Sequence, residues 1–189
     1  RNKNRAAYRL ARRPHCEKEF VMANKALAKD PSQTCILVTG GAGYIGSHTC
    51  VELLSRGYHV VVIDDLSNSS EVAINRVRTI TNCPDDQLKF HKASILDREA
   101  MERIFTENDI DAIIHFAGFK AVGESVHKPL EYYWNNLTGT LVLCDVARNH
   151  GVKNVIFSSS ATVYGEPEFV PITESCPKHE ATNPYGQTK

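Results

Sequence analysis

The sequence predicts a doubly wound α/β fold, in which a parallel sheet carries helices on both faces. Short apolar runs alternate along the chain with longer amphipathic segments, a pattern typical of parallel strands joined by helical crossovers. The residues with unusual chemistry follow these apolar runs, at the carboxyl ends of the expected strands, where sheets of this class bind ligands. With 42% hydrophobic and 23% charged residues in 189, the composition is that of an ordinary globular protein.

Strands and helices are expected in strict alternation. The expected strands are residues 35–39, 58–63, 88–93, 111–116 and 152–158, and the expected helices are 44–56, 70–81, 97–108 and 129–150. Gly57 stops the first helix, Asp97 is expected to cap the third, and Pro129 suits the first turn of the fourth. Residues 165–182 hold three prolines and are expected to form a loop, after which Asn183 and Pro184 begin a further helix.

A glycine-rich turn joins the first strand to the first helix in the pattern Gly40-x-x-Gly43-x-x-Gly46. Gly40 permits a tight turn, Gly43 lets the backbone approach a pyrophosphate, and Gly46 lets the helix pack closely on the sheet. The helix N-terminus then offers unpaired N–H groups to phosphates. Three glycines alone are weak evidence, because a plain strand–helix turn can also hold them.

The second strand ends in Asp64, eighteen residues after Gly46, which is close to the spacing of the acidic residue in a dinucleotide site. A carboxylate there accepts hydrogen bonds from ribose hydroxyls and repels a 2′-phosphate, which favours NAD over NADP. Asn68 and Ser69 lie just beyond and are expected to reach the adenosine half. The sequence therefore predicts a Rossmann-type domain that binds NAD.

Tyr185 and Lys189 are four residues apart in the expected last helix, so both point to one face. A nearby ammonium group stabilises a phenolate, which lets the tyrosine act as a base. Ser160 follows the fifth strand and is expected to face the same crevice. A tyrosine and a lysine at this spacing are common on protein surfaces, so the pair gains weight only from its place after a five-stranded nucleotide-binding sheet.

Several longer motifs are similar to those of one family. They resemble the extended branch of the short-chain dehydrogenase/reductase superfamily and, within it, the UDP-glucose 4-epimerases; the segments are 39–48, 115–125, 128–133, 157–165 and 183–186. The resemblance runs from about residue 35 to residue 189. It is specific, because several long motifs occur in the same order.

The resemblance implies NAD-dependent epimerisation of UDP-glucose and UDP-galactose at C4, a reaction of galactose metabolism that passes through a transient 4-keto sugar. Tyr185 would take the proton from the sugar 4-hydroxyl, Ser160 would hydrogen-bond that oxygen, and Lys189 would hold the nicotinamide ribose. Further implied cofactor contacts follow the glycines and the later strands: Tyr44, Ile45, Ser94, Ile95, Phe116, Ala117, Gly118, Lys120 and Asn135. The implied UDP-sugar contacts are Ser160, Ala161, Thr162 and Tyr185, and Asn136 matches a structural asparagine of the superfamily.

Two features depart from the family. Ser94 stands where the family usually has an aspartate that contacts the adenine, so somewhat weaker NAD binding is expected. The family also continues for well over a hundred residues past the position of Lys189, with further strands and a smaller domain that grips the UDP-sugar. The chain is therefore expected to be a Rossmann-type sheet truncated before the substrate domain, inactive by itself.

Two other functions stay open. A sugar-nucleotide dehydratase of the same superfamily would carry an Asp-Glu pair beside the strand-end serine, where this chain has Ala161 and Thr162. A non-catalytic NAD-binding or partner-binding module would need only the glycine loop and Asp64.

The remaining expectations concern the tail, the cysteines and partners. Residues 1–34 are expected to be a basic, poorly ordered tail, and 35–189 the NAD-binding domain. The chain has no net charge and no apolar run of membrane-spanning length, so neither nucleic acid nor a membrane is an expected partner. No metal ion is expected, since no cysteine pair has metal-binding spacing. Cys35 and Cys144 are expected in the core in reduced form, as in a cytoplasmic protein. A homodimer of the full-length protein is left open.

Overall fold

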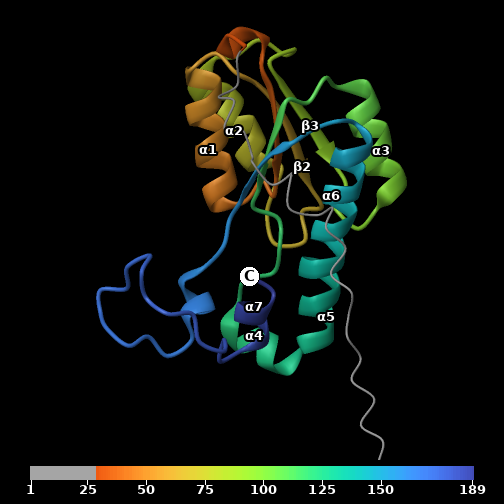
Figure 1. The fold of residues 1–189 in the computed structure, drawn as a ribbon. Coiled ribbons are helices and arrows are strands. Elements are labelled where there is room, and N and C mark those ends of the chain that lie inside the picture. Colours follow the sequence, from red (N-terminus) through yellow and green to blue (C-terminus); the bar gives the residue numbers. More distant parts are fainter. Residues whose placement is uncertain (1–28) are drawn as a thin grey trace, which may run out of the picture.

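The core of the molecule is a five-stranded parallel sheet with the strand order β3-β2-β1-β4-β5 (Figure 1). The computed structural model describes residues 29–189. Its strands are β1 (Cys35–Thr39), β2 (His59–Asp64), β3 (Leu88–Lys92), β4 (Ala112–His115) and β5 (Asn154–Phe157). The chain runs outward from β1 to β3 and then crosses back, so that β4 pairs with the other side of β1. The predicted doubly wound fold is confirmed.

Helices cover both faces of this sheet. In Figure 1, α1 (Tyr44–Ser55) and α2 (Val72–Thr81) lie on one side, and α3 (Arg98–Glu107) and α6 (Gly139–Asn149) lie on the other. Because side chains alternate along a strand, Leu37 joins the apolar cluster under α3 and α6, while Val38 joins the cluster under α1 and α2. Both side chains are fully buried. Burial on both faces explains why β1 and β2 read as continuous apolar runs.

Local signals place several helix ends as expected. Asp97 caps α3, since its carboxylate accepts a hydrogen bond from the Ala100 N–H at 3.0 Å. Gly57 has a φ of 88° just after α1, a conformation that glycine adopts without strain. The last helix, α7 (Pro184–Gln187), is capped by the preceding residue Asn183, whose side chain accepts a hydrogen bond from the Gly186 N–H at 2.8 Å.

The long helix predicted for residues 129–150 consists of three pieces. These are α5 (Pro129–Tyr133), a π-helical turn η2 (Trp134–Thr138) and α6. The described residues also contain three short helical segments that the sequence did not predict, namely α4 (Val122–His127) and the 3₁₀ turns η1 (Pro31–Gln33) and η3 (Ala161–Tyr164). The next residue after η2, Gly139, packs so closely on Ile95 that a Cβ would lie 2.7 Å from the Ile95 Cγ1 atom.

The structure corrects the predicted burial of one cysteine and describes only a small part of the predicted N-terminal tail. Cys144 was expected in the core but is exposed, because it lies on the outward face of α6; Cys35 is half-buried. The described part begins before residue 35, with a 3₁₀ turn η1 (Pro31–Gln33) and the fully buried Thr34. Residues 1–28 of the predicted tail lie outside the described residues.

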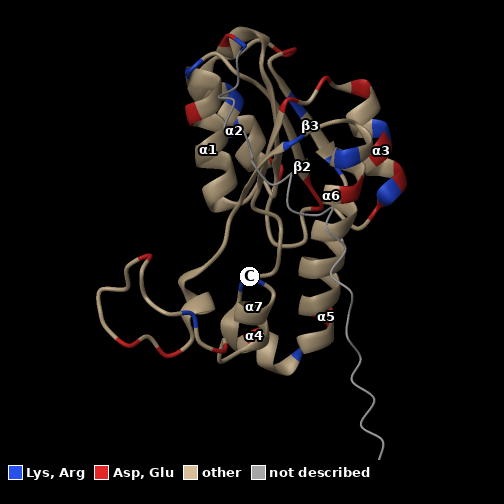
Figure 2. Ribbon diagram, viewed as in Figure 1, with Lys and Arg blue, Asp and Glu red and all other residues tan. Residues whose placement is uncertain are grey.

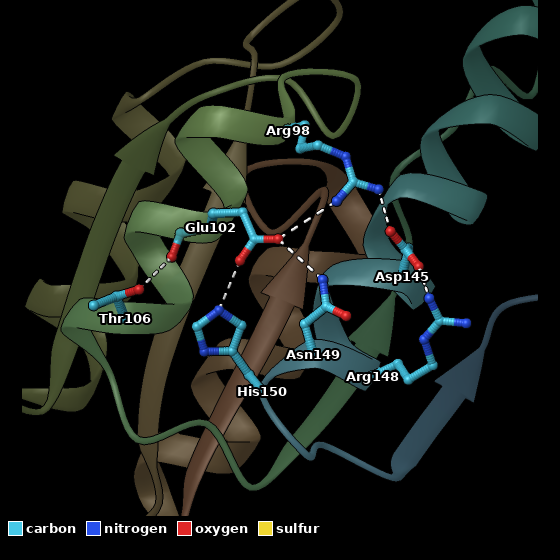
Figure 3. Close-up of polar contacts among 7 residues, drawn as sticks. All are labelled: Arg98, Glu102, Thr106, Asp145, Arg148, Asn149 and His150. Atoms are coloured by element: carbon cyan, nitrogen blue, oxygen red, sulfur yellow. Dashed lines mark hydrogen bonds and ion pairs between the residues drawn. The ribbon is translucent and has the colours of Figure 1, made fainter.

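Charged side chains are concentrated on some elements and scarce on others. Figure 2 shows both signs on α3 and on the adjoining part of α6, whereas α5 is largely uncharged. Arg98 of α3 pairs with Asp145 of α6, and Glu102 of α3 accepts a hydrogen bond from Asn149 at 3.3 Å (Figure 3). Within residues 29–189, no helix is long and apolar enough to cross a membrane, and no cluster of His, Cys, Asp and Glu could hold a metal ion.

Candidate nucleotide-binding and catalytic site

The glycine loop continues directly from β1. The Gly40 N–H donates to the Ile63 carbonyl at 2.7 Å, and Gly40 then turns the chain with a φ of 69°. A Cβ on Gly40 would lie 2.7 Å from the Ala117 nitrogen, so the ends of β1 and β4 touch here. A Cβ on Gly46 would collide with the Gly40 carbonyl oxygen. Gly43 caps α1 without a side-chain hydrogen bond, so the first N–H groups of α1 have no side-chain acceptor from the cap.

Asp64, at the end of β2, ties two loops together. It is 7% exposed, and its Oδ2 atom accepts a hydrogen bond from the Ala42 N–H of the glycine loop at 3.0 Å. Its Oδ1 atom accepts from the Leu66 N–H at 2.9 Å and from the Ser69 hydroxyl at 2.7 Å. A carboxylate can accept about four hydrogen bonds, so Oδ2 can take one further donor.

One pocket lies at the carboxyl ends of the strands, where the strand order reverses between β1 and β4. Most of the residues predicted to contact the cofactor line it, in order Gly40, Gly43, Tyr44, Ile45, Gly46, Asp64, Asn68, Ile95, Phe116, Ala117, Gly118, Lys120, Asn135, Tyr185 and Lys189. Ser69 and Ser94 are not among the lining residues. Ser69 acts on Asp64 instead, and the Ser94 hydroxyl accepts a hydrogen bond from the Leu96 N–H at 3.2 Å.

Lys189 and Tyr185 close the other end of this pocket. The Lys189 Nζ atom donates to the Ser158 carbonyl at 3.1 Å and lies 5.9 Å from the centre of the Tyr185 ring. It also lies 5.0 Å from the centre of the Phe157 ring. Burial lowers the pKa of Lys189 from its usual value, because the surroundings disfavour the charged ammonium. The amine is thus held between the end of β5 and the tyrosine.

Ser160 does not lie at the pocket wall. Its Oγ atom accepts hydrogen bonds from the Thr162 N–H at 3.3 Å and the Thr162 hydroxyl at 3.0 Å, which makes it the cap of η3. The pocket instead takes Ser158 and Ser159 from this segment, while Ala161 and Thr162 also lie outside its lining. The roles predicted for Ser160, Ala161 and Thr162 stay predictions.

Asn136 anchors the pocket wall from the π-helical turn η2. It is 4% exposed, and its side chain bonds both backbone groups of Phe119, accepting from the N–H at 2.8 Å and donating to the carbonyl at 3.0 Å. It also donates to the Thr188 hydroxyl at 2.9 Å, next to Lys189. Its neighbour Asn135 lines the pocket. Asn136 therefore holds Phe119 and Thr188 in place, whereas Asn135 faces the pocket.

Some lining residues were not singled out from the sequence. Asp65 and Ser67 line the pocket beside Asp64, and Phe119 lines it beside Gly118. Each is a sequence neighbour of a predicted residue, and that adjacency was the available signal. Asp65 is the notable addition, since it places a second carboxylate next to Asp64.

The parallel sheet, the glycine loop and the acidic end of β2 define a Rossmann-type α/β domain with a dinucleotide-binding fingerprint. Residues 37–189 match the model of the family described as GDP-mannose 4,6 dehydratase. The chain belongs to this family.

Individual proteins that are similar in sequence to this chain have a different name, UDP-glucose 4-epimerase. It is 65% identical over 154 residues to the UDP-glucose 4-epimerase of Bacillus subtilis (strain 168), covering 82% of this chain and 44% of that protein. It is 58% identical over 154 residues to the UDP-glucose 4-epimerase of Haemophilus influenzae, covering 82% of this chain and 45% of that protein. The predicted resemblance to UDP-glucose 4-epimerases is confirmed.

A solved structure agrees with these relatives. The crystal structure of UDP-glucose 4-epimerase from Bifidobacterium longum, in complex with NAD⁺ and UDP, superposes with a TM-score of 0.80 at 56% identity. The match covers 82% of this chain and 46% of that one. The chain thus spans somewhat less than half the length of the relatives that it matches.

Proposed function

We propose that this chain is the NAD-binding part of an enzyme that epimerises UDP-glucose and UDP-galactose at C4 through a transient 4-keto sugar. The observation that carries the proposal is a single pocket that contains the glycine loop and Asp64 together with Tyr185 and Lys189. The epimerase from Bifidobacterium longum, similar to this chain, was crystallised with NAD⁺ and UDP, which supports the same ligands here.

The residues of the pocket fit a dinucleotide. The N-terminus of α1 and the missing Cβ of Gly43 suit a pyrophosphate, and the remaining acceptor position on Asp64 suits a ribose hydroxyl. Two adjacent carboxylates, Asp64 and Asp65, would repel the 2′-phosphate of NADP. When bound, NAD supplies a site that accepts and returns a hydride.

The protein residues at the other end supply proton transfer and orientation. Tyr185 takes the proton from the sugar 4-hydroxyl, and the ammonium group of Lys189 stabilises the resulting phenolate. The bond from Lys189 to the Ser158 carbonyl fixes the direction of the lysine side chain. Lys120, which is exposed at the pocket wall, contributes a positive charge toward the cofactor.

A sugar-nucleotide dehydratase is the second candidate, because the matching family is described by that activity. Removal of water from a sugar requires an acid and a base beside the sugar ring. The segment that follows β5 offers Ser160, Ala161 and Thr162 and no carboxylate before Glu166. This observation favours the epimerase.

A homodimer and a cytoplasmic location belong to the same proposal. Along α5, η2 and α6, exposed apolar side chains recur every three or four residues on one helix face. This α5–α6 stripe comprises Leu130, Trp134, Leu137, Leu141 and Cys144. Such spacing is typical of paired helices and favours a second copy of the chain as the partner that covers this stripe.

The five cysteines of the described part are free, which favours a reducing compartment.

The test uses this chain and a longer form, in which the remaining residues of the Bacillus subtilis relative are fused after Lys189. We expect both to bind NAD in a calorimetric titration, and the longer form to convert UDP-galactose to UDP-glucose. In the longer form, Tyr185→Phe should lower the rate at least about 100-fold while NAD still binds, because proton transfer is lost.

Each alternative has its own result. A longer form that binds NAD but converts no sugar would point to a non-catalytic module. Release of water from the nucleotide sugar would identify a dehydratase. Failure of the chain to bind NAD would remove the basis of the proposal.

A further inference from the structure

A buried histidine, next in sequence to the pocket residue Phe116, connects the end of β1 to α6. His115, the last residue of β4, is 1% exposed, and both of its ring nitrogens have hydrogen-bond partners. The Nδ1 atom lies 2.6 Å from the hydroxyl of Thr39, and the Nε2 atom lies 2.9 Å from the hydroxyl of Thr140. Thr39 immediately precedes Gly40, and Thr140 belongs to α6, so the ring connects the glycine loop to the long helix.

The donor and the acceptor can be assigned for each hydrogen bond that links Thr39, His115 and Thr140. The Thr140 hydroxyl donates its only proton to the Asn136 carbonyl at 2.6 Å, so it must accept from the His115 Nε2–H group. A neutral ring with a proton on Nε2 has an acceptor at Nδ1, which therefore receives the Thr39 hydroxyl proton. The Thr39 oxygen in turn accepts from the Ala117 N–H at 3.3 Å. Each hydroxyl thus donates one bond and accepts one.

The bonded groups lie at the pocket wall that residues 117–119 form. Ala117 is tied at its N–H by Thr39, and Phe119 is tied at both backbone groups by Asn136. Between them, Gly118 has a φ of 148°. The wall is therefore a short loop held at both ends, and it lies against Gly40, whose absent Cβ would touch the Ala117 nitrogen.

We propose that His115 is a positioning residue for the cofactor, holding the pocket wall at residues 117–119 in register with the glycine loop through Thr39 and Thr140. The inference rests on the proposed function in that it takes NAD as the ligand. A histidine suits the task because its donor and acceptor lie on opposite sides of a rigid ring, whereas both polar atoms of a glutamine are on one carbon.

The test compares variants that remove or keep each hydroxyl group. Thr39→Val and Thr140→Val keep the shape and lose the hydrogen bonds, while Thr39→Ser and Thr140→Ser keep both. In calorimetric titrations of the full chain with NAD, each valine variant should weaken binding about ten-fold, and each serine variant should stay within about two-fold of wild type. His115→Gln should behave like the valine variants.

Two readouts separate positioning from general stability. Thr79→Val removes an exposed hydroxyl that bonds the Asn75 carbonyl on α2; neither residue lines the pocket, so NAD affinity should stay unchanged. The Thr39→Val/Thr140→Val double variant should lose less affinity than the product of the two single losses, because both act through one ring. Valine variants that melt earlier but bind NAD within two-fold of wild type would overturn the proposal.

A third measurement does not depend on NAD. The ¹⁵N spectrum of the His115 ring should show a neutral ring with its proton on Nε2, and a proton on Nδ1 would contradict the assignment. If the wild-type chain binds no NAD, the proposed function fails. The hydrogen-bond relay from Thr140 through His115 and Thr39 to the Ala117 N–H is then tested by amide hydrogen exchange. The Ala117 N–H should exchange faster in Thr39→Val than in Thr39→Ser, and equal rates would overturn the relay as well.

Discussion

Gly46 lies where α1 begins to cross the backbone of the glycine loop. Its neighbours there are the Gly40 carbonyl and the Gly41 Cα atom, and a Cβ would lie 2.7 Å from the latter. Both are main-chain atoms that cannot rotate away, so an added methyl group must push the helix off the loop. Position 46 therefore needs glycine for space and not for an unusual φ.

Gly46→Ala should destabilise the chain by about 1–3 kcal/mol, the usual range for overpacking, and should weaken NAD binding because the N-terminus of α1 moves. Chemical denaturation and a calorimetric titration measure the two effects. Gly123→Ala is the matched control: its Cβ would meet nothing within 4 Å on α4, and alanine should be neutral or stabilising by up to about 1 kcal/mol. Equal stability of the two variants would contradict the packing argument.

The burial of His115 also predicts a dependence of stability on pH. Burial, assisted by the nearby charge of Lys189, lowers the pKa of His115 to about 4 from an ordinary value of 6.5. Above pH 6.5 the ring is neutral in both the folded and the unfolded chain. Between pH 6.5 and 4 only the unfolded chain takes up the proton, so stability is progressively lost as the pH falls.

The loss assigned to His115 amounts to about 3 kcal/mol across this window, at about 1.4 kcal/mol for each unit of pKa difference. Denaturant midpoints between pH 7 and 4 measure it, and His115→Gln should flatten the profile. Burial lowers the pKa of His91 as well, so part of the slope should persist in the variant. An unchanged slope in His115→Gln would show that the ring is protonated in the folded chain.

At the scale of single residues, sequence spacing predicted where some side chains of the site lie and did not predict others. The distance from the glycine loop to Asp64 follows from one strand–helix–strand unit, so the sequence could locate the carboxylate. The sequence did not indicate η3, the turn that Ser160 caps, so it gave no sign that Ser160 lies outside the pocket lining; the role predicted for Ser160 stays a prediction. The Thr39–His115–Thr140 contact joins three elements far apart in sequence, and no spacing rule indicates it.

At the scale of elements, the long helix shows what periodicity can and cannot predict. Its existence and outer limits follow from the apolar pattern and from Pro129 and Gly151. The π-helical turn at Trp134–Thr138 is a change of hydrogen-bond register, which leaves no separate mark in the apolar pattern. Both asparagines lie in this turn, where Asn135 lines the pocket and Asn136 bonds Phe119.

The contact between α3 and α6 includes a polar network at the surface (Figure 3). Asp145 of α6 pairs with both Arg98 and Arg148, and hydrogen bonding to Arg98 lowers the pKa of its carboxyl. Glu102 of α3 accepts a hydrogen bond from His150 at 2.8 Å, which lowers the pKa of Glu102. The network therefore links two helices that cover the same face of the sheet.

Asp145→Asn should lower the melting temperature more than Glu52→Gln, which removes an exposed pair at 3.5 Å between Glu52 of α1 and Arg56, the residue that follows this helix. The reason is that Asp145 joins two helices, whereas Glu52 supports only one. Both effects should be small and should shrink in 1 M salt, because exposed ion pairs are screened. Equal shifts for the two variants would mean that the network does not contribute to the α3–α6 contact.

At the scale of the whole molecule, the covering of the sheet is uneven. The strands β1 and β2 are buried on both faces, whereas all four residues of β5 are exposed, with Ile156 at 64%. The sequence predicted all of these strands from the same kind of apolar run. Which runs end up covered depends on neighbouring elements, and a local pattern does not contain that information.

The α5–α6 stripe gives the last prediction, which concerns assembly. Trp134 is 65% exposed and Leu141 is 68% exposed, and residues 134–144 contain no charged side chain. Burying these side chains against a second copy would remove apolar surface from water, whereas placing a lysine there would bury a charge. Sedimentation of the chain should therefore give twice the mass of one copy, and the Leu137→Lys/Leu141→Lys variant should sediment as a monomer. Ile80→Lys, at a 68% exposed position on α2, is the control and should stay dimeric. A wild-type chain that remains monomeric at high concentration would rule out the stripe as a contact between two copies.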